Sequence, residues 1–88
     1  MSEQFDEIRR QITANDEAIV AAVNHRLELV VALWELKAEL GLDTVDPDRE
    51  RLLRKTLTAT NGGPLSAEGL DRLVTDLLTL TKRELGAS

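Results

Sequence analysis

Three basic side chains are placed along one stretch of sequence where they could bind an anion. Between residues 5 and 40, apolar residues recur at alternating steps of three and four, which is typical of the apolar stripe of an α-helix. Arg26 occupies the stripe itself, and Arg9 and Lys37 each follow a stripe position by one residue. An unpaired guanidinium on a buried stripe costs several kcal/mol. Arg26 therefore indicates a stripe open to water, a salt bridge to a carboxylate such as Asp76 or Glu84, or a bound anion.

The spacing of these cations limits how they could share a ligand. Arg26 and Lys37 are eleven residues apart, which on a helix is about 20° in azimuth and ~16 Å along the axis. Each side chain can lean inward by about 5 to 6 Å, which leaves room for a small anion between them. Arg9 is ~25 Å from Arg26 along the same helix, too far to share that anion. Arg9 could join the site only from a second chain packed antiparallel.

A second polar group follows a short loop, in the segment Asp46-Pro47-Asp48-Arg49-Glu50. Helix capping alone explains its first three residues: Asp46 can accept from free amides, Pro47 suits the first helical position, and Asp48 adds favourable charge. For Arg49 and Glu50 the simplest interpretation is an ordinary solvated ion pair. The loop would fold this group back beside the end of the first helix that carries the lysine.

The composition excludes several classes of function. The chain has 88 residues and no cysteine, so disulfides, a cysteine-based zinc site and a thiol nucleophile are excluded. His25 is the single histidine, and it has no partner at the spacing of a catalytic triad or a metal site, so we expect no metal. A net charge of −5 argues against nucleic acid or an anionic membrane as a partner. The polar N-terminal segment lacks a signal or membrane span, so a cytoplasmic location is expected.

The element that must position the three cations is one long helix, predicted from Phe5 to Leu40 and stopped by Gly41. About 36 residues at ~1.5 Å each give a rod of ~54 Å, longer than a folded monomer of this size is wide. Such a rod needs a partner along much of its length. The stripe residues are Phe5, Ile8, Ile12, Asn15, Ile19, Ala22, Arg26, Leu29, Leu33, Leu36 and Leu40.

Two shorter helices complete the predicted all-α fold of a single domain, residues 1–88. The second helix begins after the cap at Asp46 and runs to about Ala59. Residues 60–64 form a turn, Ser66 caps the third helix, and that helix ends near Gly86. A small chain with such a long helix is expected to be an intertwined homodimer.

The residue types, order and spacing of these polar groups resemble the active-site pattern of the all-helical (type II, bacterial) chorismate mutases. The resemblance covers nearly the whole chain and includes the contexts Ile8-Arg9-Arg10-Gln11-Ile12, Asn24-His25-Arg26-Leu27-Glu28-Leu29 and Asp46-Pro47-Asp48-Arg49-Glu50-Arg51. It implies a dimer of three-helix chains with two active sites, each completed by Arg9 of the other chain. It also implies that the chain rearranges chorismate to prephenate in the biosynthesis of phenylalanine and tyrosine.

The same resemblance assigns a role to each site residue. Arg26 and Arg9 of the second chain would hold the two substrate carboxylates with help from Arg49. Lys37 would contact the ether oxygen and a carboxylate, and Glu50 with the backbone at Asp46 would hold the ring hydroxyl. A Claisen rearrangement is unimolecular and needs no nucleophile, metal or cofactor. The enzyme selects the near-attack conformer and stabilises charge on the ether oxygen, and fixed cations do both.

The chain departs from the family pattern at two places. Trp34 stands where family members commonly have a small residue. On the third helix, Thr81 aligns with a family hydroxyl, but Leu85 aligns with the Gln or Glu that usually helps the lysine hold the ether oxygen. Glu84 is adjacent but points about 100° away on a regular helix. Residues 82–88 are near a chain end and are expected to be mobile, so a partner protein such as a shikimate-pathway synthase could activate a weak enzyme by reordering them.

Two alternative functions stay open from the sequence. An isochorismate pyruvate lyase has a similar fold and a related pericyclic reaction, but its relatives tend to lack the acidic residues that correspond to Asp46 and Glu50. A non-catalytic helical module that regulates another shikimate-pathway enzyme is the second alternative, and Leu85 keeps it open because the family's ether-oxygen donor is missing.

Overall fold

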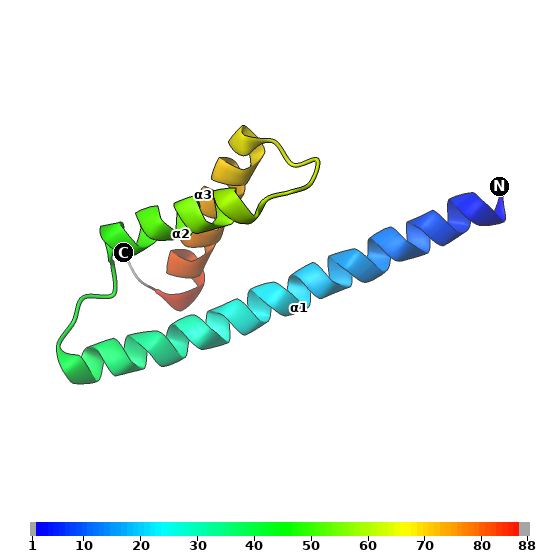
Figure 1. Cartoon of the computed structure of the whole chain (residues 1–88). Coiled ribbons are helices and arrows are strands. Elements are labelled where there is room, and N and C mark those ends of the chain that lie inside the picture. Colours follow the sequence, from blue (N-terminus) through cyan, green and yellow to red (C-terminus); the bar gives the residue numbers. More distant parts are fainter. Residues whose placement is uncertain (1, 87–88) are drawn as a thin grey trace. The chain divides into compact units, whose positions relative to one another are not determined.

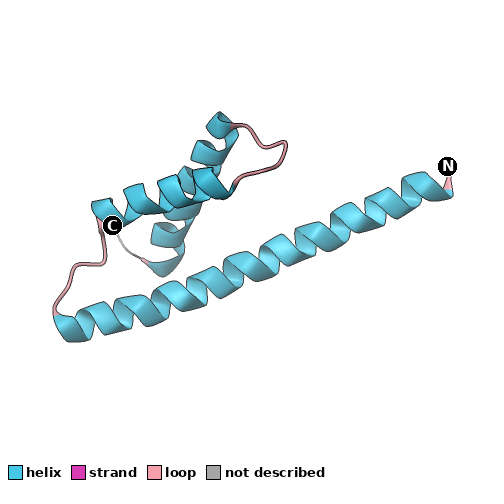
Figure 2. Ribbon diagram, viewed as in Figure 1, coloured by secondary structure: helices cyan, strands magenta, loops and turns pink. Residues whose placement is uncertain are grey.

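The computed structural model describes residues 2–86, which form three α-helices and no strand (Figures 1 and 2). The helices are α1 (Glu3–Leu40), α2 (Pro47–Thr60) and α3 (Ala67–Leu85). The predicted all-α fold with one long and two shorter helices is confirmed, and each predicted helix end lies within two residues of the observed end. The described chain falls into two compact units that meet within α1, one ending at Leu33 and the other beginning at Trp34. The prediction of a single domain stays a prediction.

The first helix begins two residues before its predicted start because Ser2 caps it. The Ser2 hydroxyl oxygen accepts a hydrogen bond from the amide of Phe5 at 3.1 Å, and the Ser2 carbonyl accepts from the amide of Asp6 at 3.2 Å. Glu3 and Asp6 place negative charge in the first turn, where the helix dipole favours it. Helix α1 has no buried residue, so its stability does not come from a core of its own.

The apolar stripe of α1 is exposed in the single chain. Each of its large apolar side chains is at least 40% exposed. Exposed apolar surface on this scale is unusual for a monomer and marks a contact surface. These residues are Phe5, Ile8, Ile12, Ile19, Leu29, Leu33, Leu36 and Leu40.

The second unit opens with the end of α1, which is closed by a Schellman motif. The amide of Leu42 donates to the carbonyl of Lys37 at 2.8 Å, and the amide of Gly41 donates to the carbonyl of Ala38 at 3.2 Å. Gly41 adopts a φ of 72°, which is in the left-handed region that favours glycine. The turn that stops α1 is therefore anchored on the backbone of Lys37.

Replacing Gly41 with alanine is expected to destabilise the protein by about 1 to 2 kcal/mol, because a Cβ is strained at this φ. No atom lies within 4 Å of the added Cβ, so the loss reflects backbone conformation and not a clash. Urea unfolding at fixed protein concentration measures it. Gly62→Ala is the matched control, since its Cβ also meets open space and its φ is not positive. Equal urea midpoints for the two variants would contradict the view that the positive φ of Gly41 requires glycine.

Helices α2 and α3 pack against each other as a hairpin (Figure 1). The predicted caps are confirmed: the Asp46 carboxylate accepts from the amide of Arg49, and the Ser66 hydroxyl accepts from the amide of Gly69. In the connecting loop, the Asn61 side-chain amide donates to the carbonyl of Leu65 at 2.9 Å. The start and direction of both helices are thus fixed by local hydrogen bonds.

The small core of the second unit lies along α3, where Leu70, Val74 and Thr81 are buried. Arg54 of α2 adds a polar clamp to this packing. Its guanidinium donates to the side chain and the carbonyl of Asp71, at 2.7 and 3.1 Å, and to the Thr75 hydroxyl at 2.9 Å. The clamp fixes α2 against the first half of α3.

Candidate active site

The second unit carries six of the eight predicted site residues, on three elements. Lys37 lies in the last turn of α1, Asp46 caps α2, and Arg49 and Glu50 lie in the first turn of α2. Thr81 and Leu85 lie in the last turns of α3. The other two residues, Arg9 and Arg26, lie on α1 in the first unit.

Lys37 is half-buried, and its ammonium donates to the carbonyl oxygen of Thr44 at 3.3 Å. This bond ties the lysine to the loop that leads to α2. An ammonium group has three N–H donors, so one bond to a carbonyl leaves two donors for a ligand. Lys37 is therefore held at both its backbone and its side chain, which suits a fixed electrostatic donor.

Asp46 places the first turn of α2 by two hydrogen bonds. Its carboxylate accepts from the amide of Arg49 at 3.2 Å, and its carbonyl accepts from the amide of Glu50 at 3.1 Å. The Arg49 side chain is exposed and makes no ion pair with any residue in the range 2–86. The interpretation of Arg49 and Glu50 as a solvated pair is wrong, because the two side chains leave the helix in different directions.

Glu50 pairs instead with Lys82 of α3, with 3.5 Å between the carboxylate Oε1 and Nζ. The Glu50 side chain is 31% exposed and that of Lys82 is 38% exposed. The contact joins the N-terminal turn of α2 to the last turns of α3, and each charge has the sign that its helix end favours. Lys82 was not among the site residues predicted from the sequence.

Thr81 and Leu85 lie on the covered side of α3. Thr81 is buried, and its hydroxyl donates to the carbonyl of Leu77 at 2.7 Å. Leu85 is half-buried and is the last helical residue, followed by Gly86 with φ of 75° as the C-cap. Glu84 is exposed, as expected for a helix that stays regular to this point. Ala87 and Ser88, the end of the segment expected to be mobile, lie outside the described residues.

In the first unit, two neighbouring arginines have different surroundings. Arg10 forms an ion pair with Glu7 at 2.7 Å, and hydrogen bonds from Arg10 and then Gln11 lower the pKa of the Glu7 carboxyl. The Arg9 guanidinium lies over the ring of Phe5, 5.1 Å from its centroid, and has no carboxylate partner in the described chain. Arg9 thus remains available to an anion, whereas Arg10 is already neutralised.

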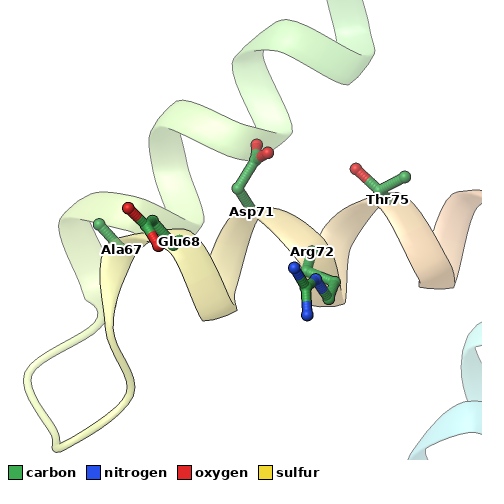
Figure 3. Close-up of a pocket in the computed structure, with 5 residues that line it drawn as sticks. All are labelled: Ala67, Glu68, Asp71, Arg72 and Thr75. Carbon is green, nitrogen blue, oxygen red and sulfur yellow. The ribbon is translucent and has the colours of Figure 1, made fainter.

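A surface depression on α3 is separate from the predicted site residues. It is lined by Ala67, Glu68, Asp71, Arg72 and Thr75 and includes none of the predicted site residues (Figure 3). Two of its polar groups already bind Arg54. Within residues 2–86 no group of three or more acidic or histidine side chains is placed to hold a metal ion. None of the described helices is long and apolar enough to span a membrane.

Comparison with known proteins identifies relatives of the chain. A sequence model of the chorismate mutase type II family matches residues 8–84. Among solved structures, the chain is similar to form I of chorismate mutase from Thermus thermophilus, with 29% identity, a TM-score of 0.85, and coverage of 90% of this chain and 99% of that one. Form II of the same enzyme gives 29% identity, a TM-score of 0.84 and 90% coverage of both chains. A search of curated proteins found no match.

Proposed function

Because the chain belongs to the chorismate mutase type II family, a family of isomerases, we propose that it rearranges chorismate to prephenate. The observation that carries the proposal is that the family match spans residues 8–84 and therefore includes every cation of the predicted site. The solved relatives at 29% identity are chorismate mutases as well. Prephenate formation would place the protein in the biosynthesis of phenylalanine and tyrosine.

The proposed mechanism is conformational restraint with electrostatic stabilisation. Arg26 and the second chain's Arg9 bind the substrate carboxylates, with Arg49 assisting, and so select the compact conformer in which the reacting carbons are close. The C–O bond breaks as the C–C bond forms, and negative charge develops on the ether oxygen. Lys37 stabilises that charge. Its anchoring to Thr44 supports this role, since a fixed donor needs little reorganisation.

The remaining proposed contacts position the ring of the substrate. Glu50 and the backbone at Asp46 bind the ring hydroxyl. Thr81 lies near a carboxylate of the substrate. The capping bonds of Asp46 support this role because they fix the turn that carries Glu50. The rearrangement is unimolecular and pericyclic, so it needs no nucleophile, general base, metal or cofactor.

We further propose that the working form is an intertwined homodimer. The exposed stripe of α1 supports this, because a second copy presents the same stripe and a two-fold contact would cover both. Burying apolar surface stabilises by about 25 cal/mol per Å². The dimer would also supply Arg9 to the site from the second chain.

The function is tested by incubating the purified protein with chorismate and measuring prephenate. Saturable formation of prephenate above the uncatalysed rate is the expected result. A parallel incubation with isochorismate, assayed for pyruvate, tests the lyase alternative. Pyruvate release without prephenate formation would establish a lyase. A folded dimer inactive on both substrates, alone and with a shikimate-pathway synthase, would favour a regulatory module.

Leu85→Gln is expected to raise kcat/KM by about tenfold or more, because it restores a hydrogen-bond donor towards the ether oxygen. The position supports the change, since Leu85 lies on the covered side of α3. Leu52→Gln is the control, because Leu52 is 53% exposed on α2. We also expect a shikimate-pathway synthase to activate the wild-type chain more than the Leu85→Gln variant. If the wild-type chain is highly active by itself, and neither Leu85→Gln nor the synthase raises its activity, the site does not lack a donor to the ether oxygen.

A further inference from the structure

Lys82 lies beside the proposed hydroxyl-binding group but has no role in the proposed mechanism. Its ammonium is 3.5 Å from Oε1 of Glu50, across the contact between α3 and α2. A carboxylate has two oxygens and can accept several hydrogen bonds. One oxygen of Glu50 can therefore face Lys82 while the other accepts from a substrate hydroxyl.

The Glu50–Lys82 pair differs from the ion pairs that form within a single helix. Arg10–Glu7 and Arg51–Asp48 each join residues on one helix, and all four side chains are more than half exposed. Glu50 and Lys82 come from different helices and are both about one-third exposed. A partly covered pair is screened less by water and salt, so its geometry is better defined.

Two further features of the same helix contact lie close to the pair. Thr81, the neighbour of Lys82, is buried, so this part of α3 is covered. One helical turn after Glu50, Arg54 clamps α2 to Asp71 and Thr75 of the same helix α3. Two polar contacts thus join α2 to α3. In one the cation is Arg54 on α2, and in the other it is Lys82 on α3, which pairs with Glu50.

We propose that Lys82 is a positioning residue of the substrate site: it holds the Glu50 carboxylate in the orientation that accepts the ring hydroxyl of the substrate. The inference rests on the proposed mutase function and adds a residue to it. Without Lys82 the Glu50 side chain can turn towards water, and each substrate molecule must then reorder it. A hydroxyl contact made equally in the ground and transition states affects KM more than kcat.

Lys82→Gln is therefore expected to lower kcat/KM about tenfold, mainly through KM, since misplacing a binding group by about an ångström has effects of this size or larger. Lys82→Arg keeps the charge and should retain most activity. Lys55→Gln is the matched control, because Lys55 is an exposed lysine of α2 with no ion pair in the described chain. Lys82→Met, which keeps the aliphatic stem, replaces the glutamine variant if that variant does not fold.

A double-mutant cycle separates positioning from a general structural role. In a Glu50→Gln background, Lys82→Gln should cause almost no further loss, because the group that it positions has changed. An undiminished loss in that background, or kinetics of Lys82→Gln equal to those of Lys55→Gln, would overturn the inference while leaving the mutase function intact. A wild-type protein that forms no prephenate would overturn the proposed function and this inference with it.

Discussion

Replacing Lys37 with alanine is expected to lower kcat by two to three orders of magnitude, the largest loss from any single substitution in the site. Removing one donor that stabilises a developing oxyanion costs roughly 3 to 4 kcal/mol. Lys37 is the cation assigned to the ether oxygen, the atom that gains charge as the bond breaks. Its effect should therefore appear in kcat and in kcat/KM to a similar extent. Steady-state kinetics of prephenate formation measure both.

Two controls separate this effect from damage to the loop. Lys37 also donates to the carbonyl of Thr44, so the alanine variant releases the segment before α2. Gly41→Ala strains the same turn but keeps the ammonium, and it should lose far less activity. Lys55→Ala removes an exposed lysine elsewhere and should leave kcat unchanged. A Lys37→Ala enzyme with nearly normal kcat, or one matched by Gly41→Ala, would refute the role of Lys37.

The helices could be predicted closely because their ends depend on local signals. Asp46 and Ser66 each bond to an amide three residues ahead, and Gly41 supplies the left-handed residue that ends α1. Such interactions depend only on neighbours in the chain. The start of α1 differs by two residues because a serine at position 2 caps the helix before the apolar stripe begins.

The ion pairs across α2 and α3 could not be predicted, because they depend on how the two helices cross. Sequence proximity suggested that Glu50 pairs with Arg49, whereas the structure pairs it with Lys82. The sequence signal for the Arg54 clamp was present but weak. Arg54 follows Glu50 by four residues, so the two side chains share a face of α2. Which residue of α3 would meet Arg54 required the packed hairpin.

The long stripe of α1 presents the opposite case, since its pattern was plain but its large apolar side chains are exposed in the single chain. Periodicity identifies an apolar face, and exposure shows that this face is uncovered along the helix. A helix without a core is marginal in water, so the stripe must gain its stability by packing.

Mixing inactive Arg9→Ala and Arg26→Ala chains is expected to restore activity, because each proposed site combines Arg26 of one chain with Arg9 of the other. Each heterodimer then has one intact site and one site that lacks both arginines. After random exchange about half of the dimers are heterodimers, so the mixture should reach about one quarter of wild-type activity. Exchange from denaturant, tagged purification of heterodimers and the prephenate assay measure this.

The reciprocal mixture makes the test independent of the parents' residual activity. A chain with both substitutions, mixed equally with wild type, should leave heterodimers in which each site lacks one arginine, so only wild-type homodimers work. Composite sites thus predict about one quarter of wild-type activity, whereas sites within single chains predict about one half. Arg10→Ala is the control, since Arg10 is neutralised by Glu7 on its own helix and its loss should leave every mixture unchanged. No recovery in verified heterodimers, or full activity in a monomer, would show that Arg9 does not act across the dimer.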